Sequence, residues 1–196
     1  MNKVILVGAS KTLLKNKLGK TIDSFDIVCR MNTGGKPECL TGEYKDIIGS
    51  KTNIWLCKHI AWLVLHYNHH TYDELVGFGE YKGSGPKWPP HIKDVVTKGN
   101  HIIEKCKKTL NEFNGYSARP TCGILSIFYL LEKFDKISIC GFDGFKGGHW
   151  YGNRFIANQN DSDKIAAQGF GAHNAIKESE YIEYLIKNNK INRIDE

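Results

Sequence analysis

The sequence predicts an α/β protein with one mainly parallel sheet that is covered by helices on both faces. The first observation is that short apolar runs alternate along the chain with longer segments of helical period. The second is that runs such as Val4–Val7 are apolar throughout, which is typical of a strand buried on both faces. The third is the length of 196 residues, which suits a single domain, residues 1–196, with a sizeable core.

The expected elements follow this alternation. Strands are expected at 3–8, 26–30, 53–57, 73–78, 136–141 and 190–194, and helices at 11–19, 91–112, 122–133 and 173–188. Gly8 ends the first strand, and Ser10 is placed to cap the helix that Thr12 opens. Pro120 and Thr121 likewise precede the helix at 122–133, as a fixed turn and a cap. Residues 79–90 and 143–172 have neither period, so we expect two long loops there, a type that is usually functional or mobile.

The ends of the first two strands favour a nucleotide site. Gly8 allows the backbone to come close to a ligand, and Ser10 follows it directly. The second strand ends in Arg30-Met31-Asn32, which brings a cation and an amide to the carboxyl edge of the sheet, where open α/β sheets bind nucleotides. The chain contains neither the dinucleotide-binding glycine pattern nor a Walker A lysine motif.

A third turn favours an anion. Gly123 leaves room for a ligand at the start of the helix that Thr121 caps, and a helix N-terminus is a natural site for a phosphate or a carboxylate. Taken alone, this segment is equally an ordinary turn, helix and strand.

Two histidines lie in glycine-rich surroundings late in the chain. His149 is part of Gly148-His149-Trp150-Tyr151, and His173 precedes Glu178 by five residues. A helix that starts near His173 places Glu178 about a turn and a half later, so its carboxylate is expected to orient the chain rather than to touch the same ligand atom.

Charge and cysteine content limit the partners and the compartment. The formal net charge of +6 is spread along the chain, and a nucleotide phosphate, an acidic sugar, an acidic glycan or nucleic acid would suit it. The six cysteines have no Cys-x-x-Cys spacing, and Cys29, Cys57 and Cys140 fall in strand-like runs. They indicate reduced thiols and a cytoplasmic protein. No apolar run is long enough to span a bilayer, and no signal peptide is seen.

Metal-binding patterns are weak. Asp161-Ser162-Asp163 is an Asp-x-Asp, but it lies in a polar loop rather than at a strand end, so we interpret it as solvated or as a helix cap. The histidine group of His66, His69 and His70 lacks an acidic or cysteine partner at the spacing of a zinc site.

Four segments in order resemble the motifs of one enzyme family, the sialyltransferases (glycosyltransferase family 29). The large sialylmotif is similar to 7–10, 22–26, 30–32 and 48–52; the small motif to 119–123 with 136–142; the third to 148–151; and the very small motif to 171–178. The chain departs from the pattern at Ala9 and Thr12, where the family has Asn. It also lacks the cysteine pair that joins the large and small motifs in animal enzymes.

The resemblance implies a fold and an activity. The fold is a Rossmann-like variant of the GT-A architecture. The activity is a metal-independent, inverting transfer of sialic acid or a related acidic keto-sugar from a CMP-sugar donor to a glycan or glycolipid acceptor, with no cofactor, no nucleic acid and no membrane segment. The implied base is His173, and His149 is the donor on the phosphate side. The implied nucleotide binders are Gly8, Ser10, Thr12, Arg30, Asn32, Thr121, Cys122 and Gly123.

Three alternatives stay open at this point. A transferase for another nucleotide-sugar would use Asp161 and Asp163 with a divalent metal. An inactive member would bind a nucleotide only. A basic nucleic-acid binder would show a steep salt dependence of binding.

Overall fold

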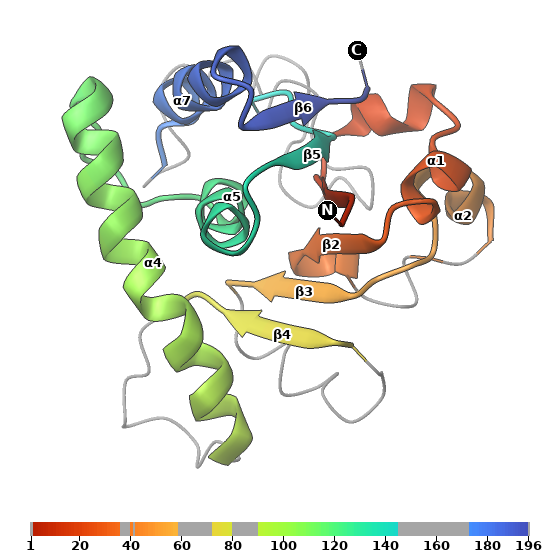
Figure 1. Ribbon diagram of the computed structural model, residues 1–196, viewed down its shortest axis with the longest axis horizontal. Helices are drawn as coiled ribbons and strands as arrows, with labels where there is room; N and C mark the ends of the chain where they lie inside the picture. The colour runs from red at the N-terminus through yellow and green to blue at the C-terminus, as the bar shows by residue number, and fades with distance from the viewer. Residues whose placement is uncertain are drawn as a thin grey trace, which may run out of the picture.

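The computed structural model describes residues 2–35, 40, 42–58, 72–79, 90–144 and 173–195. In this part of the chain, six strands form one sheet in the order β4-β3-β2-β1-β5-β6 (Figure 1). They are β1 Val4–Val7, β2 Ile27–Met31, β3 Ile54–Cys57, β4 Glu74–Gly77, β5 Ile137–Cys140 and β6 Ile191–Arg193. Every neighbouring pair is parallel. The expected α/β class, the parallel sheet and all six expected strands are therefore confirmed.

The strand order places a topological switch point beside β1. From β1 the chain first builds the sheet outward through β2, β3 and β4, and it then returns to add β5 and β6 on the other side. Ligands of open α/β sheets bind at the carboxyl ends of the strands where the order reverses. The turns that follow β1, β2 and β5 therefore meet at one place.

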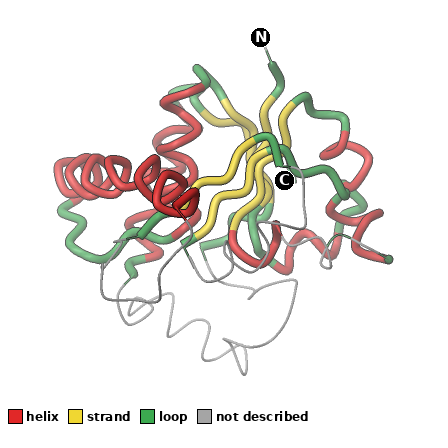
Figure 2. The backbone as a smooth tube through the Cα atoms, turned by 90° about the horizontal axis from the view of Figure 1, so that it is seen from below, coloured by secondary structure: helices red, strands yellow, loops and turns green. Residues whose placement is uncertain are grey.

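The helices cover both faces of the sheet (Figures 1 and 2). One face carries α4 Pro90–Asn114, α5 Cys122–Lys133 and α7 Ala175–Lys187. The other carries the 3-10 helix η1 Lys11–Lys15, α1 Gly19–Asp23 and α2 Glu43–Ile48. A further 3-10 helix, η2 Asn32–Gly35, follows β2 directly.

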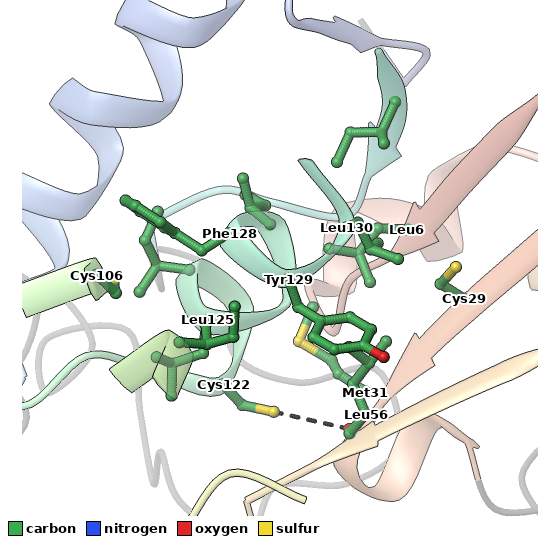
Figure 3. Close-up of a cluster of buried hydrophobic side chains, with 14 of the residues drawn as sticks. Leu6, Cys29, Met31, Leu56, Cys106, Cys122, Leu125, Phe128, Tyr129 and Leu130 are labelled. Atoms are coloured by element: carbon green, nitrogen blue, oxygen red, sulfur yellow. Dashed lines mark hydrogen bonds between the residues drawn. The ribbon is translucent and has the colours of Figure 1, made fainter. Parts of the chain in front are cut away.

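Side chains of β1 alternate between two cores. Val4 and Leu6 belong to the core under α4, α5 and α7, whereas Ile5 and Val7 pack with the helices of the opposite face. In Figure 3 the side chains of α5 lie against Leu6 and Leu56 from the sheet. Because α5 packs against the sheet, α4 and α7, it is buried on nearly every side, which explains its apolar sequence.

The predicted helix at 11–19 is wrong. The chain forms η1, extends at Asn16 and starts α1 only at Gly19. A side chain at Gly19 would place its Cβ 2.3 Å from the main-chain oxygen of Lys45, so α1 and α2 pack backbone against backbone. The sequence analysis also did not predict α2, which has only six residues. The helices at 91–112, 122–133 and 173–188 are confirmed within a few residues.

Candidate active site

A cavity of about 120 Å³ lies at the carboxyl ends of β1, β2 and β5. Its walls come from six parts of the chain, the last two being α7 and β6. They are Ala9 and Ser10; Met31 and Asn32; Thr121 to Ile124; Gly141 to Gly144; and Ala175, Glu178, Ser179, Ile182 and Arg193. Ser10, Asn32, Thr121, Cys122 and Gly123 are thus five of the predicted binding residues that the fold brings together.

Ser10 is held by three hydrogen bonds. Its hydroxyl donates to Oδ2 of Asp143 at 2.6 Å and accepts from the main-chain N–H and the hydroxyl of Thr12, at 3.0 and 2.9 Å. The serine is buried, and Asp143 lines the cavity beside it. Asp143 was not predicted, although its position two residues after an expected strand, at the edge where open α/β sheets bind ligands, was a usable signal. Thr12 lines a neighbouring groove rather than this cavity.

Gly8 has a different role from the predicted one. A Cβ at this position would lie 2.2 Å from the main-chain oxygen of Gly141, and its N–H donates to the Cys140 oxygen at 2.7 Å. The glycine thus permits β1 and β5 to approach each other where they end. It does not line the cavity, but this approach brings Ser10 to Asp143.

Arg30 is also not among the cavity residues. Its side chain is fully buried, with Nε donating to the Lys51 oxygen at 3.0 Å and Nη2 donating to the Ile48 oxygen at 2.7 Å. Burial lowers the pKa of the guanidinium to about 10. Since side chains alternate along a strand, Arg30 contacts the α2 side while Met31 lines the cavity on the other side.

Asn32 lines the cavity and has one end of its carboxamide held by the protein. Its backbone has a positive φ of 46°, and its main-chain oxygen accepts from Nε1 of Trp55 at 2.7 Å. Its side-chain oxygen accepts from the N–H of Lys58 at 3.0 Å. The carboxamide oxygen is therefore occupied, and the NH₂ group is the part of this side chain that can donate into the cavity.

Glu178 holds the turn that starts α5. Thr121 donates its N–H to Oε1 of Glu178 at 2.9 Å and its hydroxyl to Oε2 at 2.5 Å. The same threonine oxygen caps α5 by accepting from the N–H of Ile124 at 3.2 Å. Burial raises the pKa of the Glu178 carboxyl. This arrangement agrees with the expected orienting role of Glu178.

Gly123 and Cys122 form the floor at the helix start. A Cβ on Gly123 would lie 3.1 Å from Cε1 of Phe142, so a larger residue would narrow the cavity. Cys122 is buried, its Sγ lies 3.7 Å from the Leu56 oxygen, and burial raises its thiol pKa to about 12. The thiol is therefore neutral, and only its main chain is suited to an anion.

His173 lies next to the same turn, immediately before α7. Its Nδ1 is hydrogen-bonded to the main-chain oxygen of Arg119. Because a carbonyl oxygen only accepts, Nδ1 carries the proton and Nε2 keeps its lone pair. Burial lowers the pKa of His173, and the nearby charges of Lys58 and Arg119 act in the same direction. The ring is thus neutral near pH 7, the form that a general base requires.

Lys58 is a second residue that the sequence analysis missed. It follows β3 as Asn32 follows β2, and its ammonium donates to the Pro120 oxygen at 2.7 Å. Burial lowers its pKa. Its position after an expected strand was, as for Asp143, a usable signal.

Several predicted residues lie outside the described residues. They are His149, Asp161, Asp163, His66, His69, His70 and Cys39. Within the ranges that the structure does describe, no group of three or more His, Cys, Asp or Glu residues is placed to hold a metal ion. No helix in these ranges is both long and apolar enough to cross a membrane. The five described cysteines are buried and form no disulfide.

Comparison with known proteins agrees with this geometry. Residues 1–78 match the sequence profile of glycosyltransferase family 29 (sialyltransferase). No curated protein matches the chain.

The structural similarity extends over nearly the whole chain. A mammalian sialyltransferase in complex with Gal-β-1-3GalNAc-ortho-nitrophenol has a TM-score of 0.63 at 19% identity, covering 99% of this chain and 69% of that one. Another crystal structure of a mammalian sialyltransferase has a TM-score of 0.62 at 20% identity, with the same two coverages of 99% and 69%. The sialyltransferase CstII from Campylobacter jejuni, in complex with the substrate analogue cytidine-5′-monophosphate, has a TM-score of 0.56 at 14% identity, covering 98% of this chain and 79% of that one.

The fold expected from the resemblance, a Rossmann-like GT-A type, is therefore confirmed. The first 78 residues match the sequence profile of glycosyltransferase family 29, and the described part of the chain has the fold of the sialyltransferases that it resembles.

Proposed function

We propose that the protein transfers sialic acid, or a related acidic keto-sugar, from a CMP-sugar donor to a hydroxyl of a glycan or glycolipid, with inversion and without a metal. The observation that carries this proposal is that the turns of the large and small motifs meet in one cavity. The hydrogen bond that fixes the tautomer of His173 beside that cavity supports the catalytic part.

The donor phosphate fits the start of α5. Backbone N–H groups at a helix N-terminus and the positive end of the helix dipole favour an anion. The N–H of Ile124 is already used by the Thr121 cap, so Cys122 and Gly123 supply the main-chain donors. The NH₂ group of Asn32, which also lines the cavity, is a third donor.

The nucleoside fits the wall made by the β5 turn. The Asp143 carboxylate accepts one hydrogen from Ser10, and a carboxylate has acceptor sites for further donors such as the ribose hydroxyls. Phe142 offers a ring face beside Gly123, which suits the sugar or the base of a nucleoside.

In the reaction, Nε2 of His173 removes the proton of the acceptor hydroxyl while its oxygen attacks the anomeric carbon. The bond from that carbon to the phosphate breaks on the opposite side, CMP leaves, and the configuration inverts. Negative charge grows on the departing phosphate, and preorganised donors aimed at that oxygen lower the barrier. His149, the predicted donor on this side, would add to the α5 N-terminus.

Calorimetry with CMP in the presence of EDTA tests the donor and the metal independence together. CMP should bind, and at 100 times its Kd it should stabilise the fold by about 2.7 kcal/mol. Absence of CMP binding together with binding of UDP and manganese would contradict the proposal.

A transfer assay with CMP-sialic acid and a panel of galactosides then tests the activity, with the product identified by mass spectrometry. Hydrolysis of the donor without transfer would leave only the nucleotide-binding part of the proposal.

The cytoplasmic location expected from the cysteines is part of the same proposal. The free thiols of the described residues support a reducing compartment. Cell fractionation tests it, and recovery in an oxidising compartment would contradict it.

A further inference from the structure

A chain of hydrogen bonds runs from the cavity wall to His173. It starts at Thr121, which donates twice to Glu178, and continues from Oε1 of Glu178 to the hydroxyl of Tyr116 at 2.7 Å. The same hydroxyl lies 2.8 Å from the main-chain oxygen of Arg119, which is also the partner of His173. Tyr116 and Glu178 are both buried, so water does not replace these partners.

The hydrogens of this chain can be counted. The Tyr116 hydroxyl has one hydrogen, but it lies within hydrogen-bond distance of two oxygens, one from Glu178 and one from Arg119. The Arg119 oxygen has no hydrogen to give. If Glu178 were ionised, it would have none either, and one of the two short oxygen–oxygen contacts would lack a hydrogen. Two oxygens at hydrogen-bond distance with no hydrogen between them repel each other, and this repulsion is strong in a buried site.

A neutral Glu178 satisfies every contact. Its Oε1 then donates to the Tyr116 oxygen, and Tyr116 donates to the Arg119 oxygen. Oε1 still has a lone pair for the N–H of Thr121, and Oε2 accepts the threonine hydroxyl.

We propose that Glu178 is a neutral carboxylic acid in the working protein, and that Tyr116 is a positioning residue that joins it to the carbonyl holding His173. The chemical role of His173 rests on the proposed function, whereas the protonation of Glu178 does not.

The surroundings of Glu178 support this assignment. Burial raises its pKa, and this outweighs the Thr121 and Tyr116 hydrogen bonds and the charge of Lys58, all of which act in the opposite direction. Lys58 faces it from the end of β3, and the Cys106 thiol faces it from α4 with a pKa that burial also raises. No carboxylate charge then faces the cavity from α7 at Glu178, which favours an anionic ligand.

Infrared difference spectroscopy tests the protonation directly, without substrate. At pH 7, wild type minus Glu178→Gln should show the C=O stretch of a protonated carboxyl group. The matched control Glu112→Gln removes an exposed carboxylate of α4 and should show only ionised-carboxylate bands. An ionised-carboxylate difference at Glu178 would overturn the inference.

If Glu178→Gln does not fold, Tyr116→Phe provides a second test of the protonation of Glu178. The protonated-carboxyl band of the wild type should shift in this variant, since the acid loses its acceptor. Tyr184→Phe, which changes an exposed tyrosine, should leave the band in place. A wild-type spectrum at pH 7 with no protonated-carboxyl band overturns the inference on its own.

The positioning role of Tyr116 predicts a split between binding and turnover. Tyr116→Phe should lower kcat about 3- to 10-fold, the worth of one hydrogen bond, and change the Kd of CMP by less than about twofold. An unchanged kcat, or an equal loss in both quantities, would refute the positioning role.

The two kinds of measurement separate the two proposals. A protonated Glu178 in a protein that shows no transfer would refute the proposed function alone. Transfer by a protein whose Glu178 is ionised at pH 7 would refute this inference alone.

Discussion

Arg30 and Glu178 are both buried residues with ionisable side chains in family-like motifs, yet they do different things. Arg30 donates to two main-chain oxygens at the end of α2 and in the connection to β3, away from the cavity. Glu178 accepts from Thr121, lines the cavity and is linked to His173 through Tyr116. A motif therefore combines residues that hold the fold with residues that face the ligand, and sequence similarity alone does not distinguish them.

Other residues of the large motif resemble Arg30 in that they connect parts of the fold. The Asp23 carboxylate accepts from the N–H groups of Ser50 and Lys51, both within 3.0 Å. The Lys51 ammonium donates to the main-chain oxygens of Phe25 and Asp26. These groups join α1 and the start of β2 to the connection between α2 and β3, so substitutions there should act on stability rather than on chemistry.

The largest expected effect is at the base. His173→Ala should reduce transfer by about 10²- to 10⁴-fold, because the acceptor hydroxyl loses its proton acceptor. CMP affinity should stay nearly intact, since His173 is not among the residues that line the cavity. Steady-state transfer and calorimetry measure the two quantities.

The matched control is His101→Ala, which removes a surface histidine paired with Glu132 at 2.9 Å and should leave transfer unchanged. Full activity of His173→Ala would show that another group is the base.

Arg30→Met should act on stability instead. Two main-chain oxygens lose their donors, at about 1–3 kcal/mol each, so the free energy of unfolding should fall by about 2–6 kcal/mol. Urea denaturation measures this change, and CMP affinity of the folded fraction should be unaltered. A variant with wild-type stability but lost CMP binding would place Arg30 among the ligand residues and remove the contrast drawn above.

Gly123→Ala tests the cavity side of the comparison. Its added methyl group would lie 3.1 Å from the Phe142 ring and narrow the space next to the α5 N-terminus. CMP affinity should fall by about 5- to 150-fold, which corresponds to the 1–3 kcal/mol typical of overpacking, with little loss of thermal stability. Ser126→Ala, one turn along α5 and with its hydroxyl on the Cys122 oxygen, is the control that should spare CMP binding. Unchanged affinity of Gly123→Ala would mean that the ligand does not use this wall.

The smallest expected effect is a shift in pH dependence. The pKa of His173 is lowered from 6.5, so the base stays neutral, and active, at a pH where an ordinary histidine is half protonated. The acid limb of kcat/KM should therefore be centred below pH 6.5. At pH 6.5, kcat/KM should be up to about twofold higher than it would be with a histidine of ordinary pKa. Arg30, with a pKa of about 10, should contribute nothing over this range. An acid limb centred above pH 6.5 would contradict the neutral-ring assignment of His173.

Local sequence was enough for most elements. The six strands and the helices α4, α5 and α7 follow from apolar runs, from the Thr121 cap and from helical period. The helix predicted at 11–19 is interrupted because the chain is extended at Asn16, and α1 starts at Gly19, whose backbone packs against Lys45, a residue distant in sequence.

The site could be predicted only in part. Ser10, Asn32, Thr121 and Gly123 could be predicted to lie together because each follows a strand or lies at a helix start, which is a local signal, and all four line the cavity. Arg30 was expected to face the ligand, but its side chain lies on the opposite face of the sheet from the cavity. Strand alternation shows that Arg30 shares a face with Val28, but it does not show which face binds the ligand. The assignments of His149, Asp161 and Asp163 stay predictions.

By itself the sequence determined the parallel α/β class, the strand-end turns and the identity of the motif residues, because periodicity, caps and turns depend on near neighbours. Only the tertiary structure decided that Glu178 meets Thr121, 57 positions away, and that Tyr116 joins them to the carbonyl of His173. Such contacts depend on how α7, α5 and the end of α4 pack over the sheet, and no local pattern encodes which polar groups that packing brings to one place.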